Sequence, residues 1–277
     1  MRKLEKYAKQ FLIENPLLKF KKFNTNVTPI EDIRALLKLL YPLSCDIPLI
    51  RLGAQNDGGY LIPDDLVGIS ACFSPGVSSI SDFEKDCANL GMEVFLADRS
   101  VNGPAVKDKS FHFTKKFIGS FSNEEFMRID DWVLSSLPNN SDDLMLQMDI
   151  ESFEYETIIS MSEEIQKRFR IMVIEFHQLD QLWNRPFSTL AIRAFKKLLQ
   201  THKCVHIHPN NIANTQTLNG IEIVTTMEFT FFRKDRIQNE RLRNVFPHSL
   251  DADNCTKYPS KILSKDWYQI NQSMLIE

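Results

Sequence analysis

The stretch GISACFSPGVSSISDFEKDCANLGMEVFLAD, residues 68–98, contains the pattern that decides the fold. An apolar strand ends at Phe73, and the turn Ser74-Pro75-Gly76 leads into a helix that opens near Ser79. A second apolar strand then ends at Asp98. Gly76 lets the backbone approach a ligand closely, and a helix start offers free N–H groups. This unit predicts a parallel sheet that binds a ligand at its carboxyl edge.

Outward from this unit, short apolar strands continue to alternate with amphipathic helices. We expect strands at 110–117, 144–150, 169–176 and 203–208, helices at 123–137, 153–161 and 187–200, and a long strand or hairpin arm at 221–234. The alternation is typical of a doubly wound α/β sheet, mostly parallel, here with an antiparallel edge strand.

The N-terminal part carries different signals. Residues 29–40 have the apolar spacing of a helix, and residues 49–52 and 60–62 flank a turn-rich run as in a hairpin. A helix is also expected from Lys3 to Phe20, packed on the surface, with contact to an anionic membrane surface as the less favoured alternative. We therefore predict an N-terminal helical extension at 1–48 and one domain at 49–277.

Composition excludes several classes of protein. A chain of 277 residues with 43% hydrophobic residues can bury a full core. Lys and Arg number 33 against 36 Asp and Glu, a net charge of -3, which disfavours a nucleic-acid partner. The five cysteines are scattered without a CxxC pair, which argues against disulfides and zinc clusters. With no signal peptide and no apolar run long enough to span a membrane, a cytoplasmic location is expected.

Asp98 points to a nucleoside ligand. An acid at the end of the second strand can accept hydrogen bonds from both ribose hydroxyls. The turn 74–79 has a single glycine, however, and no GxxxxGK[ST] occurs, so the cradle for a pyrophosphate is missing. A cofactor with ribose and base but no pyrophosphate, S-adenosylmethionine, fits this combination.

Acids and histidines gather after the later strands. Asp149 and Glu151 lie at and just beyond the end of one strand, and Glu175 and His177, two residues apart and so on the same side, end the next. His206 and His208 share a face of a later strand. Such groups could deprotonate a hydroxyl, or hold a divalent cation that lowers the pKa of that hydroxyl. Glu154 and Glu156 are equally well explained as charges in the first turn of a helix.

At this point the sequence resembles FkbM-type methyltransferases. The run MDIESFEYETI with the later MVIEFH is similar to that family's K-x-D-x-E-G-x-E block and following strand, although Gln147 and Ser152 stand where lysine and glycine are common. A branch of the family shares further segments, which here are DGGY (57–60), CFSPGV (72–77), FLAD (95–98), KKFIG (115–119), HxHxNN (206–211) and ExTFxRKD (228–235).

The resemblance implies a class I Rossmann-like methyltransferase fold, S-adenosylmethionine as methyl donor and a sugar or polyketide hydroxyl as acceptor. It implies that Ser74, Pro75 and Gly76 lie beside the methionine part, that Asp98 binds ribose, and that Asp57, Gly58, Gly59 and Tyr60 border the cofactor pocket. His177 is then the expected base, and Asp149, Glu175 and His208 face the acceptor.

In that arrangement, Asp149 and Glu175 would either orient His177 or bind a divalent metal together with His208. Further acceptor contacts are expected from Asn210, Trp183 and Arg185, since a ring can stack on a sugar while amide and guanidinium groups bond its hydroxyls. Two alternatives stay open: a metal-dependent hydrolase that uses the same acids and histidines, and a non-catalytic binding protein. The sequence leaves the acceptor and the oligomeric state undetermined.

Overall fold

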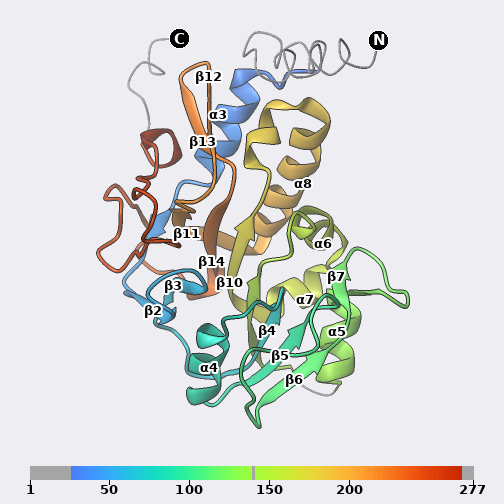
Figure 1. Cartoon of the computed structure of the whole chain (residues 1–277). Helices are drawn as coiled ribbons and strands as arrows, with labels where there is room; N and C mark the ends of the chain where they lie inside the picture. Colours follow the sequence, from blue (N-terminus) through green and yellow to red (C-terminus); the bar gives the residue numbers. More distant parts are fainter. Residues whose placement is uncertain (1–25, 139–140, 270–277) are drawn as a thin grey trace.

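The structure is a computed structural model that describes residues 26–138 and 141–269 (Figure 1). The helix expected at Lys3–Phe20 lies outside the described residues. In the part described, no helix has the length and apolar character needed to cross a membrane.

A seven-stranded sheet forms the centre of the molecule. Its order is β11 (His202–Pro209), β14 (Met227–Arg233), β10 (Phe169–Phe176), β9 (Asp143–Met148), β4 (Ile69–Pro75), β5 (Glu93–Ala97) and β6 (Phe111–Thr114). The pairs from β10 to β6 are parallel, whereas β14 runs antiparallel to both of its neighbours. The mostly parallel sheet is confirmed, but the strand that runs against the others is second from the edge, because β11 pairs outside it.

The strand order reverses between β4 and β9. From β4 the chain adds β5 and β6 on one side, and it then returns to add β9 and β10 on the other. Loops that leave neighbouring strands in opposite directions open a crevice at their carboxyl ends, where open α/β sheets bind ligands. Here that crevice lies between Gly76, directly after β4, and Asp149, directly after β9.

Different elements cover the two faces of the sheet, because successive side chains of a strand point to opposite sides. Phe73, Leu146 and Ile174 point into one core, and Cys72 and Val173 into the other. The first core is shared with α3 (Ile30–Leu39), α5 (Ile129–Ser136), α6 (Glu154–Ser160), α7 (Glu163–Arg168) and α8 (Arg185–Thr201). The second is covered by α4 (Asp82–Asn89) and by the hairpin of β2 (Leu49–Gly53) and β3 (Gly59–Pro63).

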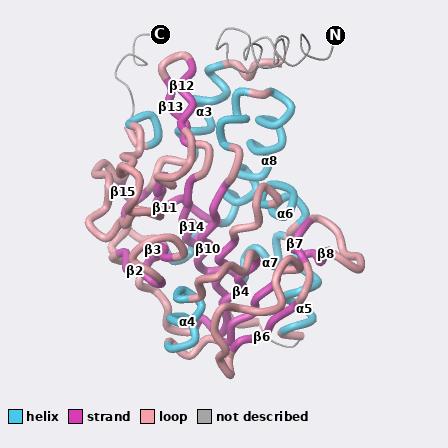
Figure 2. Tube along the Cα trace, viewed as in Figure 1, coloured by secondary structure: helices cyan, strands magenta, loops and turns pink. Residues whose placement is uncertain are grey.

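Smaller elements surround this centre. They are the paired strands β1 (Leu43–Ser44) and β15 (Arg241–Leu242), β7 (Phe117–Gly119) and β8 (Phe126–Arg128), β12 (Thr215–Leu218) and β13 (Ile221–Val224), and the short helices η1 (Leu179–Trp183), η2 (Lys234–Arg236) and η3 (Lys265–Trp267). Apart from η3, the described residues from 246 on are loop, which Figure 2 shows beside β11 and β15.

Three expected elements differ from the structure. The expected helix 123–137 begins as strand β8, which pairs with β7, and only its second half is α5. The expected arm 221–234 is two strands, since β13 pairs with β12 while β14 enters the main sheet. The helix placed near Ser79 begins at Asp82. The helix and hairpin expected at 29–40 and 49–62 are confirmed.

Candidate functional site

Two cavities meet at the crevice between β4 and β9. The larger, about 280 Å³, is lined by Asp98, Gly76 and Asp149 together with aromatic residues of β7, β8 and the loop before α6. The smaller, about 40 Å³, lies on the other side of the same glycine and aspartate, against Asp57 and Tyr60. The two cavities thus meet at Gly76 and Asp149, which line both of them.

Gly76 lines both cavities, and only glycine fits there. Its φ is +96°, in the left-handed region that side chains disfavour. A Cβ atom built on it would lie 1.6 Å from the carbonyl oxygen of Asp149. The absence of a side chain thus lets the ends of β4 and β9 come into direct contact. The close approach of a ligand to Gly76 stays a prediction.

The larger cavity combines one carboxylate with an apolar wall. Asp98 is half-buried; its Oδ2 accepts a hydrogen bond from the backbone N–H of Val77 at 3.1 Å, and its Oδ1 one from that of Ser100 at 2.6 Å. The wall is formed by the rings of Phe126, Phe117 and Phe153. The ring centroid of Phe126 lies 5.5 Å from that of Phe117 and 5.6 Å from that of Phe153. Such a cavity suits a ligand that has a flat apolar ring, which can pack on the aromatic wall, next to hydroxyl groups, which can donate to the carboxylate.

The turn of the β2–β3 hairpin forms the outer wall of the smaller cavity. Asp57, Gly58 and Tyr60 of the DGGY segment line it, whereas their contact with a cofactor stays a prediction. Gly59 does not; a Cβ there would lie 1.9 Å from the carbonyl oxygen of Ala54, so this glycine is required by the turn itself.

Ser74 and Pro75 lie behind the cavities rather than in their walls. Both are buried, and the Ser74 hydroxyl lies 2.6 Å from Glu84 Oε1 and 2.7 Å from Gln147 Oε1. The Gln147 amide in turn donates to the Tyr60 hydroxyl at 3.2 Å. The network fixes the floor of the smaller cavity, and Gln147 is an uncharged member of it.

Polar side chains continue from this floor across the hairpin-facing side of the sheet. Glu175 lies opposite Glu228 in the β10–β14 pair, and Glu228 lies opposite His208 in the β14–β11 pair. Burial raises the pKa of both glutamates, that of Glu175 strongly. From the loop region beyond β15, the Asn254 amide donates to Glu228 at 2.8 Å and to Asp57 at 3.1 Å. Asn254 therefore ties the hairpin turn to the sheet.

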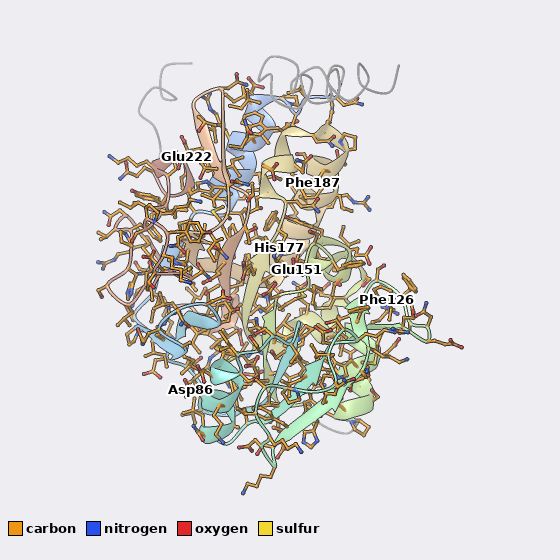
Figure 3. The ribbon with its side chains drawn as sticks, in the orientation of Figure 1. Asp86, Phe126, Glu151, His177, Phe187 and Glu222 are labelled. Carbon is orange, nitrogen blue, oxygen red and sulfur yellow. The ribbon has the colours of Figure 1, made fainter. Side chains whose placement is uncertain are left out.

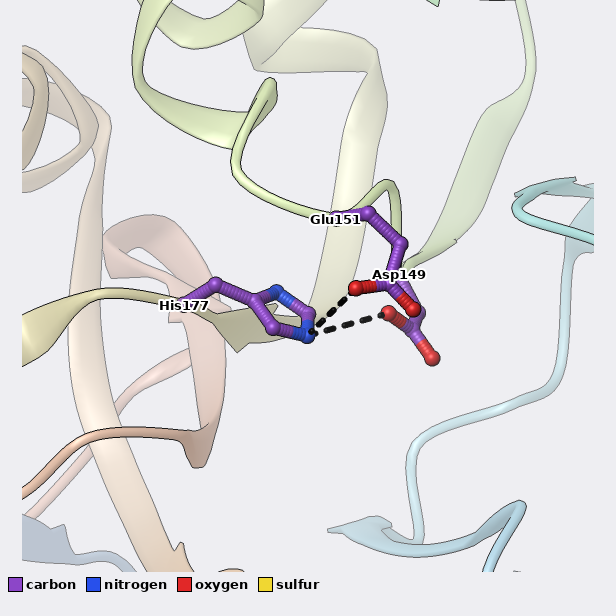
Figure 4. Close-up of side chains that lie close together, drawn as sticks. All are labelled: Asp149, Glu151 and His177. Carbon is purple, nitrogen blue, oxygen red and sulfur yellow. Dashed lines mark ion pairs between the residues drawn. The ribbon is translucent and has the colours of Figure 1, made fainter. Parts of the chain in front are cut away.

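His177 stands at the centre of a cluster of carboxylates (Figures 3 and 4). Its Nδ1 lies 3.0 Å from Oε1 of Glu154, which is fully buried, and its Nε2 faces Asp149 Oδ1 at 3.8 Å and Glu151 Oε2 at 3.6 Å. Burial lowers the pKa of His177, but the hydrogen bond with Glu154 and the nearby negative charges outweigh it and raise the pKa to about 9. Burial raises the pKa of Asp149 to about 7.

The loop between β9 and α6 holds the cluster in an unusual backbone conformation. Glu151 has φ +53° and Ser152 has φ +87°, values at which a glycine would be unstrained. The Ser152 hydroxyl accepts a hydrogen bond from the Gln178 side chain at 3.0 Å. Serine thus adopts a backbone conformation that favours glycine, and its side chain contacts Gln178 there.

Two further residues expected at the site, His208 and Asn210, have other partners than His177. His208 faces Asp251 and Glu228 rather than His177, so Asp149, Glu175 and His208 do not share one ligand position; among the described residues, the group whose ligand atoms all lie within 4.8 Å is Asp149, Glu151 and His177. The side-chain amide of Asn210 donates to Glu175 at 3.1 Å and supports the site.

The expected sugar contacts from the loop after His177 do not line the cavities. Trp183 is only 5% exposed and packs in the core, so its ring has no free face to stack on a sugar. Arg185 is exposed at the start of α8, where its backbone N–H donates to the Asn26 carbonyl. Neither residue lines either cavity.

Sequence reasoning placed Glu151 at the ligand-binding edge of the sheet without giving it a role, left Glu154 open between a helix-start charge and a catalytic group, and missed Glu228 as a member of the site. The signal for the first two was present in the acid spacing of MDIESFE, where three carboxylates follow a strand within six residues. Glu228 carried no local signal beyond its place at the start of a strand.

Comparison with known proteins adds no family. No family model matches the chain, and no curated protein matches it. The resemblance to FkbM-type methyltransferases therefore rests on the residues quoted above.

Proposed function

We propose that the chain is an S-adenosylmethionine-dependent O-methyltransferase that acts on a hydroxyl of a sugar or glycan-type acceptor. The observation that carries the proposal is a pair of cavities that share Gly76 and Asp149 in their linings, one with Asp98 and an aromatic wall and the other with the hairpin turn. The adenosine part fits the larger cavity, with its ribose hydroxyls donating to Asp98, and the amino-acid part extends toward the smaller one.

The sheet supports the same reading. Numbered along the chain, the main strands follow the order 3-2-1-4-5-6 of doubly wound nucleotide-binding sheets, with one antiparallel strand inserted between the last two. A class I methyltransferase fold is built on such a sheet. The crevice at its order reversal is where the cofactor would bind, and both cavities lie there.

Methyl transfer requires the acceptor oxygen to be aligned with the sulfonium methyl. The O–C bond forms as the S–C bond breaks, which leaves S-adenosylhomocysteine, a methyl ether and the hydroxyl proton. Asp149 lines both cavities beside Gly76, where we place the sulfur, and Glu151 and His177 lie next to Asp149. This cluster can assist by taking up the proton or by holding a cation that lowers the pKa of the hydroxyl.

Calorimetric titration with S-adenosylhomocysteine tests the cofactor site. We expect the wild type to bind with a micromolar dissociation constant and Asp98→Asn to bind roughly 10- to 100-fold more weakly, because a hydrogen bond to a charged group is worth about 1.5–3 kcal/mol. Asp64→Asn, at an exposed aspartate at the far end of the hairpin, is the matched control and should bind like the wild type.

Absence of binding to the wild type would contradict the proposal. If the protein bound a metal ion under the same conditions, the metal-dependent hydrolase would become the leading candidate. Once binding is established, methylation of a panel of sugars by radiolabelled S-adenosylmethionine identifies the acceptor.

A further inference from the structure

The space between Asp149, Glu151 and His177 has the geometry of a cation site. The imidazole Nε2 lies 3.8 and 3.6 Å from one oxygen of each carboxylate, too far for a hydrogen bond. One metal ion holds nitrogen and oxygen ligands at roughly 2.0–2.2 Å, so two of its ligands lie roughly 3–4 Å apart. The observed spacings fall in that range (Figure 4).

His177 is oriented as metal-binding histidines are. Its Nδ1–H donates to Glu154, a carboxylate with no exposed surface, which leaves Nε2 directed at the two other acids. An ion that binds Nε2 displaces the proton from that nitrogen. A buried carboxylate behind a histidine fixes the tautomer and makes the ligand nitrogen more basic. Glu154 is itself fixed by the backbone N–H of Ser152 at 3.0 Å.

The local charge is unbalanced without a cation. Three carboxylates, Asp149, Glu151 and Glu154, surround a single imidazole, and among the described residues their ion pairs are with this imidazole rather than with a lysine or arginine. One proton on the imidazole offsets one of these charges, whereas a divalent ion offsets two. The Asp149 Oδ1 atom is buried and has no hydrogen-bond partner, as a ligand atom awaiting an ion would be.

We propose that Asp149, Glu151 and His177 bind a divalent transition-metal ion, with Glu154 as the positioning residue behind the histidine. One imidazole and two carboxylates suit Mn²⁺ or Zn²⁺ better than Mg²⁺ or Ca²⁺, which favour oxygen ligands alone. Because two of the three ligands also line the larger cavity, the open positions of the ion face it. If the proposed methyltransferase function holds, the acceptor hydroxyl occupies one of these positions and its pKa falls.

Titration of the chelator-treated full chain with Mn²⁺, with free ion measured by electron paramagnetic resonance, tests the site. We expect one ion per chain. His177→Gln and Glu151→Gln should weaken binding at least about tenfold, and Glu154→Gln roughly 10- to 100-fold although it touches no ion. His112→Gln is the matched control, because His112 also pairs with a glutamate, Glu93, but on the exposed side of β6. Co²⁺ absorption bands that change in His177→Gln, Glu151→Gln and Glu154→Gln but not in His112→Gln would confirm that the ion binds at this cluster.

The outcomes separate this site from the proposed function. The proposed metal site is overturned if the wild type binds neither Mn²⁺ nor Co²⁺, even if S-adenosylhomocysteine binds. It is also overturned if His177→Gln binds these ions as tightly as the wild type does. Metal binding that survives in Asp98→Asn, together with cofactor binding that survives in His177→Gln, supports both. Metal binding in a chain that binds no S-adenosylhomocysteine supports the site and overturns the function. Thermal unfolding of each variant confirms that it is folded.

Discussion

His202 should make the protein sensitive to acid. It begins β11, at the end of the sheet opposite the cavities, and is fully buried. Its Nε2–H donates to the Phe169 carbonyl at 2.6 Å, and its Nδ1 accepts from the Thr201 hydroxyl at 2.7 Å. The Thr201 oxygen in turn accepts from the Gln166 amide. The chain of hydrogen bonds is complete only with a neutral imidazole.

The size of the effect follows from the pKa. Burial lowers the pKa of His202 from 6.5 to about 4, against the opposing effect of the Phe169 carbonyl. Above pH 6.5 both the folded and unfolded states are neutral at this residue, and full stability is present. As the pH falls from 6.5 toward 4, only the unfolded state binds a proton. The free energy of unfolding therefore drops by roughly 2 kcal/mol at pH 5 and roughly 3 kcal/mol at pH 4 from this residue alone.

Urea unfolding at pH 7 and pH 5 measures this drop. We expect the wild type to lose roughly 2 kcal/mol more than His202→Gln between the two values, because glutamine can still donate to the Phe169 carbonyl but does not titrate. His112→Gln controls for the removal of one exposed histidine. An equal loss in wild type and His202→Gln would refute the reasoning.

Two further predictions concern backbone conformation. Ser152→Gly should leave the free energy of unfolding within about 1 kcal/mol of the wild type, since relief of strain at φ +87° offsets the entropy of glycine, whereas Ser152→Val should cost roughly 2 kcal/mol or more. Equal losses in urea unfolding would contradict this. Gly76→Ala should cost roughly 3 kcal/mol or more and abolish S-adenosylhomocysteine binding. Gly91→Ala is the control, because Gly91 has φ +91° but no atom within 4 Å of the added Cβ. It should lower the free energy of unfolding by only about 1–2 kcal/mol and leave S-adenosylhomocysteine binding unchanged. Similar behaviour of the two alanine variants would show that the contact between residue 76 and Asp149 is unimportant.

Strand and helix alternation could be predicted because it depends on local periodicity. The apolar run at 169–176 became β10, and the residues at the strand ends, Asp98, Asp149 and Glu175, reached the carboxyl edge as expected. Parallel strands place their C-terminal ends together, so position in sequence determined position in the site.

What could not be predicted depends on contacts distant in sequence. Residues 126–128 have helix-like neighbours, but pairing with β7 draws them into a strand. His208 lies at the predicted carboxyl edge of the sheet, but its partner there is Asp251, which comes from a loop segment without periodicity. This pairing keeps His208 apart from His177. Glu154 is a first-turn carboxylate by position, and only the left-handed backbone before it shows that it reaches the histidine.

The Asn254 tie between the hairpin turn and the sheet has a consequence for synthesis. Its partner Asp57 lies 197 residues earlier, and at roughly 5–20 residues per second the ribosome needs roughly 10–40 s to make the intervening chain. During that interval β2, β3 and most of the sheet have emerged, but the hairpin turn is not yet held over the smaller cavity. We therefore expect the growing chain to pass through a stage with a formed sheet and an unfinished pocket, so that ligand capture comes at the end of synthesis and does not guide it.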